Sequence, residues 1–339
     1  MENTNTICIQ VSQMENEFTR ILLKHGFQET KARVLASVFT GNSVDGILSH
    51  GVNRFTRFIT YVQNGLIHPD AEPVLDHSAG AVEQWNGQLG PGPLNAIKCT
   101  ERAMQLARNS GIGCVALSNT NHWMRGGTYG WQAANEGFVF IGWTNTISLM
   151  PAWGATDTKL GNNPLVIAVP YGDEAIVLDM AMSQYSYGRM ESKALEHSTL
   201  DFAGGYNAAG QLTCDPVEIL ASKRPLPIGY WKGAGLALLL DILSAILSGG
   251  LSTHKISEKP DETGVSQVYI AIDTHRLSNF PSIQSIVSGI IDDYQHSFPA
   301  DEHSTIRYPG ERILQIRAAN LREGILVNRK IWDEILNLG

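Results

Sequence analysis

The spacing of apolar residues changes about one third of the way along this chain, and that change restricts the fold more than any other feature. Up to about residue 110, apolar side chains recur every three or four positions, as Phe55, Phe58 and Val62 do, which predicts amphipathic helices. Beyond that point, short continuous apolar runs predict buried strands at 113–117, 138–143, 165–169, 175–180 and 268–273. Helices are predicted at 96–107, 128–135, 233–247, 283–294, 311–322 and 328–338, and polar loops at 192–210 and 257–264. Strands interleaved with helices favour an α/β fold with a mixed sheet covered by helices.

The balance of apolar and charged residues predicts a compact protein. Of 339 residues, 43% are apolar and 17% are charged, and the charged share is below the usual value of about 25%. Such a chain buries much of its surface, which is in line with an oligomer. The formal net charge is −8 and no long run of Lys or Arg occurs, so nucleic acid is not an expected partner.

Cysteines and apolar stretches bear on the cellular compartment. The four cysteines are scattered without a Cys-x-x-Cys pair, which argues against a disulfide framework or a zinc ribbon. The first ten residues lack the basic and apolar regions of a signal peptide. The longest apolar stretch, 236–247, is interrupted by Asp241 and Ser244 and is shorter than the ~20 residues of a membrane span. We therefore expect a cytoplasmic protein with no metal site and no membrane segment.

The segment Leu48-Ser-His-Gly-Val-Asn-Arg54 places a titratable imidazole four residues before a guanidinium. His50 is suited to proton transfer near neutral pH. Arg54 offers the planar fork that matches a carboxylate. Together they predict an enzyme that acts on a small oxo- or hydroxy-acid, although a Ser-His-Gly sequence is also an ordinary turn.

Two further segments follow predicted strands, where site residues of open α/β sheets often lie. Asn121-His-Trp-Met-Arg-Gly-Gly127 carries His122, a candidate second acid or base; the alternative is a histidine satisfied within a polar loop. Thr144, at the end of the strand predicted at 138–143, offers a side-chain donor.

A carboxylate and an ammonium complete the set of candidates. Asp179 ends an apolar strand and needs a histidine, a lysine or backbone amides as partner, because an isolated buried carboxylate is costly. It could orient an imidazole or simply cap a loop. Lys232 precedes a helix predicted from Gly233, where ammonium and free amides could bind a phosphate; the alternative is a tight turn.

The glycine fingerprint of Rossmann dinucleotide-binding proteins is missing. Gly111-Ile-Gly113 precedes a strand instead of following one, and Gly233-Ala-Gly235 has no third glycine. The residues alone therefore give no support for a Rossmann cofactor site.

The ordered set of motifs nevertheless resembles a known family. The motifs are the segments 48–54 and 121–127 quoted above, Gly161-Asn-Asn-Pro164, Leu178-Asp-Met-Ala-Met-Ser183 and Gly229-Tyr-Trp-Lys-Gly233. This set is similar to the type-2 malate/L-lactate dehydrogenase family, also called the sulfolactate-dehydrogenase-like family, from about residue 11 to the end. The segment 123–127 and the doublet Tyr230-Trp231 look most like members that reduce diketo sugar acids.

This resemblance implies a non-Rossmann mixed β-sheet with helices on its faces and a helical domain built from both chain termini. The expected domains are a helical one at 1–115 with 290–339 and a nicotinamide-binding sheet domain at 116–289, which includes a smaller third segment at about 185–225. The resemblance also implies a homodimer with cofactor and substrate near the subunit interface.

Site residues are carried over by motif. The resemblance implies that His50 is the proton donor, with Ser49 to orient it and His122 as a second catalytic histidine. It implies substrate contacts from Arg54, and we add Asn121 and Thr144 as candidate ligands. The implied cofactor contacts are Ala175, Ile176, Val177, Leu178, Asp179, Met180, Ala181, Trp231, Lys232, Gly310, Glu311 and Arg312. The segment Tyr187-Gly-Arg-Met-Glu-Ser-Lys193 departs from the malate-type pattern, which puts the cofactor preference in doubt.

The expected reaction is the NADH-dependent reduction of a ketone in a keto-acid sugar, with NADPH as the less preferred cofactor. His50, as imidazolium, would donate a proton to the forming alkoxide. One alternative is a malate, lactate or ureidoglycolate dehydrogenase of the same family. Others are a cofactor-free, His-dependent lyase or isomerase of sugar acids, and a binding protein that has lost catalysis.

Overall fold

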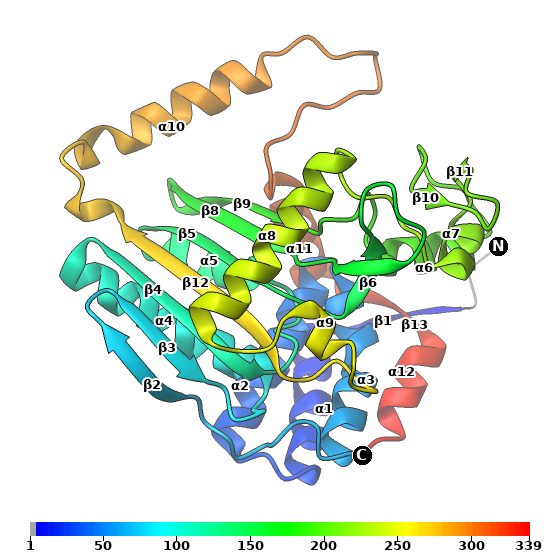
Figure 1. Cartoon of the computed structure of the whole chain (residues 1–339), viewed down its shortest axis with the longest axis horizontal. Helices are drawn as coiled ribbons and strands as arrows, with labels where there is room; N and C mark the ends of the chain where they lie inside the picture. Colours follow the sequence, from blue (N-terminus) through cyan, green and yellow to red (C-terminus); the bar gives the residue numbers. More distant parts are fainter. Residues whose placement is uncertain (1–4) are drawn as a thin grey trace.

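The computed structural model describes residues 5–339, and its centre is a seven-stranded mixed sheet (Figure 1). The strand order is β2 (Val74–Ala79), β3 (Val82–Asn86), β4 (Ile112–Thr120), β12 (Val265–Asp273), β5 (Phe138–Thr144), β8 (Leu165–Tyr171) and β9 (Glu174–Met180). All neighbours are antiparallel except β3 and β4. The five strands predicted from apolar runs are confirmed. The hairpin β2–β3 was not predicted, since β2 is exposed along its whole length and has no apolar run.

Helices cover both faces of the sheet because side chains alternate along each strand. Val115 and Leu117 of β4 pack into a core with α4 (Gly92–Ser110) and α5 (Gly127–Asn135). Ala116 points the other way, into a core with α8 (Trp231–Ser248). The predicted mixed sheet with helices on its faces is therefore confirmed.

A helical unit lies beside the sheet and uses both ends of the chain. Its elements are α1 (Val11–Lys24), α2 (Glu29–Val44), α3 (Val52–Gln63), α11 (Glu311–Glu323), α12 (Arg329–Leu336), and β1 (Thr6–Ile9), which pairs with β13 (Ile325–Asn328). Phe18 stacks on Phe55 at 4.0 Å between ring centroids and contacts Trp332 at 6.3 Å. The expected domain boundary at residue 115 is too late, because β2, β3 and α4 belong to the sheet unit.

The segment at about 185–225 forms a small module with its own core. It contains α6 (Tyr187–Leu195), β10 (Gly205–Tyr206), β11 (Leu212–Thr213) and α7 (Pro216–Ser222). Its core consists of Tyr185, Met190, Leu200 and Ile219. The loop predicted at 192–210 is therefore partly wrong, since α6 and β10 reach into it. The remaining short elements are β6 (Ser148–Pro151), β7 (Thr158–Gly161), α9 (Thr253–Ile256) and 3₁₀ turns at Leu48–His50 and Thr274–Arg276.

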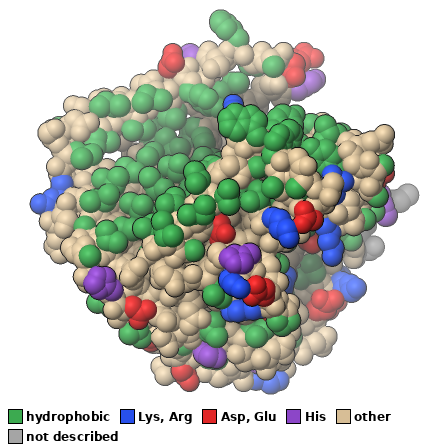
Figure 2. All heavy atoms as spheres, in the orientation of Figure 1, with side chains coloured by type: hydrophobic (Ala, Val, Ile, Leu, Met, Phe, Trp, Pro, Cys, Tyr) green, Lys and Arg blue, Asp and Glu red, His purple; other side chains and the backbone are tan. Residues whose placement is uncertain are grey.

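Two apolar helix surfaces are exposed in the described part of the chain, residues 5–339. α10 (Phe280–Gln295) stands off from the body as an arm (Figure 1), and Ile291 is its one buried residue. Figure 2 shows a broad band of hydrophobic side chains on the face that carries α8. Within residues 5–339, α8 alone is long and apolar enough to cross a membrane, by length and composition only. It is longer than the expected run at 236–247, and its buried side packs on β12.

Candidate active site

The turn between α2 and α3 fixes the position of His50. The Ser43 hydroxyl at the end of α2 donates to the Phe39 carbonyl at 2.8 Å and accepts the Val52 amide at 2.9 Å. Gly51 lies directly against Ser43, and a Cβ atom there would collide with the Ser43 hydroxyl. The Ser-His-Gly sequence is therefore a close approach of two chain segments that only glycine allows.

Asn42 holds the backbone of His50 from the side of α2. Its amide nitrogen donates to the His50 carbonyl at 2.9 Å, and its amide oxygen accepts the Thr128 hydroxyl of α5 at 2.8 Å. Asn42 is fully buried, so it ties the helical unit, the histidine and the sheet unit together. Sequence reasoning missed this residue, because its partners lie 8 and 86 positions away.

The structure brings His50 and His122 together. Their rings are nearly parallel, with centroids 5.7 Å apart and 25° between planes. Ser49 Oγ lies 2.9 Å from His50 Nδ1, so Nε2 is the ring nitrogen of His50 that is left for a ligand. His122 Nδ1 accepts the Met124 amide at 2.9 Å, which places the proton of the neutral ring on Nε2.

Both imidazoles are neutral at pH 7 in the empty protein. Burial, and next the positive charges of Arg54 and Arg125, lower the pKa of His50 to about 4. Burial, followed by Arg54, lowers the pKa of His122 well below its ordinary value. The imidazolium that we expect at His50 during the reaction therefore requires a bound group that raises this pKa.

Arg54 is a guanidinium with no protein partner. It lies in the first turn of α3, deep in the molecule, and no described residue engages it in a hydrogen bond or an ion pair. Burial, and next the charge of Arg57, lower its pKa, while Glu262 and Glu191 act the other way. Arg54 is half-buried, and a partly desolvated cation without a counter-charge is suited to an anionic ligand.

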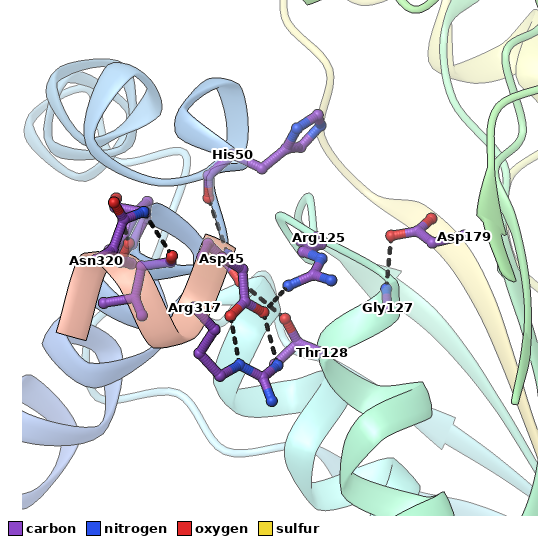
Figure 3. Close-up of polar contacts among 12 residues, drawn as sticks. Asp45, His50, Arg125, Gly127, Thr128, Asp179, Arg317 and Asn320 are labelled. Atoms are coloured by element: carbon purple, nitrogen blue, oxygen red, sulfur yellow. Dashed lines mark hydrogen bonds and ion pairs between the residues drawn. The ribbon is translucent and has the colours of Figure 1, made fainter. Parts of the chain in front are cut away.

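Asp179 completes the same region from the end of β9. Its Oδ2 accepts the Gly127 amide at 2.7 Å, so its partner is one of the predicted choices, a backbone amide (Figure 3). His50 and His122 are half-buried, and Asp179 is exposed. All three side chains therefore keep surface that a ligand can reach.

A buried ion cluster lies near His50, between the helical unit and the sheet unit. Asp45, after α2, accepts hydrogen bonds from Arg125 and from Arg317 of α11, the latter at 2.7 and 2.9 Å (Figure 3). Asp45 and Arg125 are buried. The imidazole of His50 points away from this cluster. The cluster therefore joins the helical unit to the sheet unit and does not contact the imidazole.

The three predicted cofactor segments meet around β9, which is an edge strand of the sheet. The Val177 amide donates to the Pro309 carbonyl at 3.2 Å, which brings Gly310, Glu311 and Arg312 to this strand. Beyond its other end, the Ile228 amide donates to the Met182 carbonyl at 2.8 Å and leads to Trp231 and Lys232.

The side chains of these predicted cofactor segments differ in how accessible they are. Ala175 and Val177 point into the core, whereas Ile176, Leu178, Met180 and Ala181 are partly accessible. Helix α8 begins at Trp231, so Lys232 lies in its first turn, and both side chains are exposed. A buried oxygen of Glu311 has no partner among the described residues.

Two predicted substrate ligands have other tasks. The Asn121 amide nitrogen donates to the carbonyls of Leu66, Leu89 and Gly90 at 2.9 to 3.1 Å, which leaves only its Oδ1 for a ligand. The buried Thr144 hydroxyl donates to backbone carbonyls at 2.9 and 3.2 Å. Geometry therefore gives no support to a substrate contact from Thr144.

Two surface pockets lie elsewhere. One of about 480 Å³ is lined by α1 and α12 residues such as Arg20 and Trp332, and one of about 390 Å³ by Asp45, Trp131 and Arg317 among others. Neither contains His50 or His122. Among residues 5–339, no group of three or more His, Cys, Asp or Glu side chains is arranged to hold a metal ion.

Comparison with known proteins identifies the family. The malate/L-lactate dehydrogenase family matches residues 9–336. A 2,3-diketo-L-gulonate reductase of Escherichia coli is 42% identical over 328 residues, which cover 96% of this chain and 98% of the relative. The sulfolactate dehydrogenase of Methanocaldococcus jannaschii has a similar structure, with a TM-score of 0.89 and 27% identity over 98% of this chain and 96% of its own. A malate dehydrogenase of Entamoeba histolytica, 24% identical, shares the fold with a TM-score of 0.92 over 98% and 97%.

The chain belongs to the malate/L-lactate dehydrogenase family, as its motifs predicted. It is an oxidoreductase, and its family implies a nicotinamide cofactor and a small keto-acid substrate.

Proposed function

We propose that this protein reduces 2,3-diketo-L-gulonate to 3-dehydro-L-gulonate with NADH, and that His50 is the proton donor. The observation that carries the proposal is the His50–His122 pair beside the unpartnered guanidinium of Arg54. Such a set can hold a carboxylate and protonate a nearby carbonyl oxygen. The identity of 42% to a relative named for this substrate supports the choice of sugar acid.

The chain's own residues divide the remaining work. A bound nicotinamide supplies the hydride, which is the chemistry of the cofactor itself. Arg54 binds the substrate carboxylate, His122 donates from Nε2 to a substrate oxygen, and His50 holds a proton at Nε2 for the oxygen of the ketone. Ser49 orients the His50 ring through Nδ1. The segments around β9, Trp231 and Gly310 hold the cofactor.

His50 takes up its proton from solution when the substrate binds. In the empty protein the imidazolium is disfavoured by burial and by Arg54. A carboxylate on Arg54 offsets that positive charge and raises the pKa of His50. His50 is therefore protonated, and able to donate a proton, only when a keto acid is bound.

The apolar faces of α8 and α10 support the proposed homodimer. Seven large hydrophobic side chains on α8 are exposed: Trp231, Leu236, Leu238, Leu239, Ile242, Leu243 and Ile246. Monomeric proteins rarely expose contiguous apolar patches of such extent. We propose that a second copy of the chain covers them, and that the protein works in the cytoplasm.

A substrate panel tests the proposed function. We expect the highest kcat/KM with 2,3-diketo-L-gulonate and NADH, a lower value with NADPH, and much lower values with oxaloacetate and pyruvate. Preference for oxaloacetate, pyruvate or ureidoglycolate would favour the other dehydrogenases of the family. Turnover of a sugar acid with no nicotinamide present would favour the lyase or isomerase.

A further inference from the structure

The buried carboxylate of Glu262 has no task in the reaction described so far. Glu262 is 8% exposed and lies in the loop between α9 and β12. The start of β12 pairs with the end of β4 at Val265 and Thr120, and Gln267 donates to the Asn121 carbonyl at 3.2 Å. The loop therefore lies against the chain segment that leads to His122.

Cations surround this carboxylate without pairing with it. Arg54 and Arg57, one helical turn apart on α3, are the positive groups that act on Glu262, and the Ile147 backbone donates a hydrogen bond to it. No ion pair joins Glu262 to another residue in the described part of the chain. Burial raises the pKa of Glu262, while Arg54, Arg57 and the Ile147 amide act the other way. Its oxygens thus keep acceptor capacity that the protein does not use.

The other walls of this region are polar as well. Tyr187 of α6 donates to the Leu149 carbonyl at 2.9 Å, two residues from Ile147. Gly188 packs against Ser49, so α6 closes the side of the site next to His50. Glu191, also on α6, is exposed and acts on Arg54 from the solvent side. Of the two carboxylates that act on Arg54, Glu191 is exposed and Glu262 is buried, so Glu262 has the more fixed position.

We propose that Glu262 is a specificity-determining residue that accepts hydrogen bonds from hydroxyl groups on the substrate tail while Arg54 holds the substrate carboxylate. This inference rests on the proposed function. A polyhydroxylated monocarboxylate places donors against Glu262. A dicarboxylate places its second negative charge there, and the resulting repulsion excludes it.

Glu262→Gln tests this inference, because the change keeps the shape and removes the charge. We expect kcat/KM for the diketo sugar acid to fall by about 10-fold or more and that for oxaloacetate to rise, so that their ratio falls by roughly 10- to 100-fold. NADH affinity, read from its fluorescence, should stay constant, which a general structural defect would not allow. Glu258→Gln is the matched control: Glu258 lies in the same part of the chain but is exposed, paired with Lys255 at 2.9 Å, and its loss should leave the ratio unchanged.

Inhibition of the unmodified enzyme gives an answer even if the variant does not fold. Polyhydroxylated monocarboxylates such as L-gulonate should compete with the keto acid, and L-malate should compete at least about tenfold more weakly. Equal inhibition by both, or an unchanged ratio in a folded Glu262→Gln variant, overturns the inference alone. Failure of the unmodified enzyme to reduce any polyhydroxy keto acid with a nicotinamide overturns the proposed function, and the inference with it.

Discussion

Two neutral imidazoles lie beside a guanidinium that has no protein partner. This arrangement is unfavourable without a bound anion, because a half-buried cation prefers a counter-charge. It is favourable once a carboxylate is bound, since Arg54 then gains its partner and His50 can be protonated. The chemistry of these single residues is therefore the basis on which we propose that the site binds an acid.

The first residue-scale prediction concerns His50 itself. His50→Ala should lower kcat by at least about 10²-fold, because the proton donor is lost, while NADH still binds. Steady-state kinetics and NADH fluorescence measure the two effects. Near-normal turnover in this variant would remove His50 from the mechanism.

The second concerns protons taken up on binding. The pKa of free His50 is lowered to about 4, and a carboxylate on Arg54 should raise it, so ligand binding near pH 6–7 should take up protons. Affinity should therefore increase as pH falls, down to about pH 4 where free His50 is itself protonated. Calorimetry of L-gulonate binding in buffers of different ionisation enthalpy counts the protons. The His50→Gln variant should take up fewer protons, and equal uptake in both proteins would show that another group titrates.

At the scale of elements, the junction of α2 and α3 fixes the positions of His50 and Arg54, two residues of the proposed site. Ser43 caps the start of α3, Asn42 holds the His50 carbonyl, and Gly51 allows the two segments to touch. His50 and Arg54 are placed by this junction and not by a flexible loop. The addition of one methyl group at this junction should displace both His50 and Arg54.

Gly51→Ala should therefore cost both stability and activity. The added Cβ collides with the Ser43 hydroxyl, and relief of such overpacking typically costs about 1–3 kcal/mol. Gly41→Ala is the control, because Gly41 lies within α2 and its Cβ would have nothing within 4 Å. That change should raise stability by up to about 1 kcal/mol. Equal melting temperatures for the two variants would contradict this account of the Ser-His-Gly turn.

At the scale of the whole molecule, the site lies where separate units meet. Asp45 directly follows α2, Arg125 lies in the loop before α5, and Arg317 belongs to α11. The ion cluster thus joins the helical unit to the sheet unit near His50. Elsewhere, apolar side chains of α8 and α10 are exposed in the part of the chain that the structure describes.

Removal of the central carboxylate should uncouple these units. Asp45→Asn leaves Arg125 buried without its counter-charge, so the free energy of unfolding should fall by about 3–5 kcal/mol. Glu136→Gln, which breaks the exposed pair with Arg108, should cost less than ~1 kcal/mol. Denaturant titration of both variants measures the difference, and similar losses would show that burial of the Asp45 cluster has no special effect.

Assembly should depend on the α8 face. Leu239 and Ile246 are 56% and 64% exposed, and changing both to Glu should convert the expected dimer to a 37 kDa monomer. Leu326→Glu, on β13 at 65% exposure, should leave the dimer intact. Sedimentation velocity separates the species. A monomer already in the unmodified protein would refute the proposed homodimer.

Local patterns in the sequence were enough for much of the fold. The continuous apolar runs located five of the seven strands of the central sheet, since such runs are typical of strands that bury much of their side-chain surface. Helical spacing located the helices that cover them, and the order of motifs gave the family. The spacing of His50 and Arg54, four residues apart across a helix start, already placed an acid beside an anion-binding group.

Tertiary structure decided what depends on partners far away in the chain. It added the exposed hairpin β2–β3 to the sheet, because pairing and not apolar content holds an edge strand. It stacked His50 on His122 and made both neutral, since a pKa is set by burial and by charges such as Arg54 and Arg125. It also showed that the Thr144 hydroxyl donates its hydrogen bonds to backbone carbonyls. Hydrogen bonds and electrostatic fields are sums over neighbours in space, and no local pattern of residues contains them.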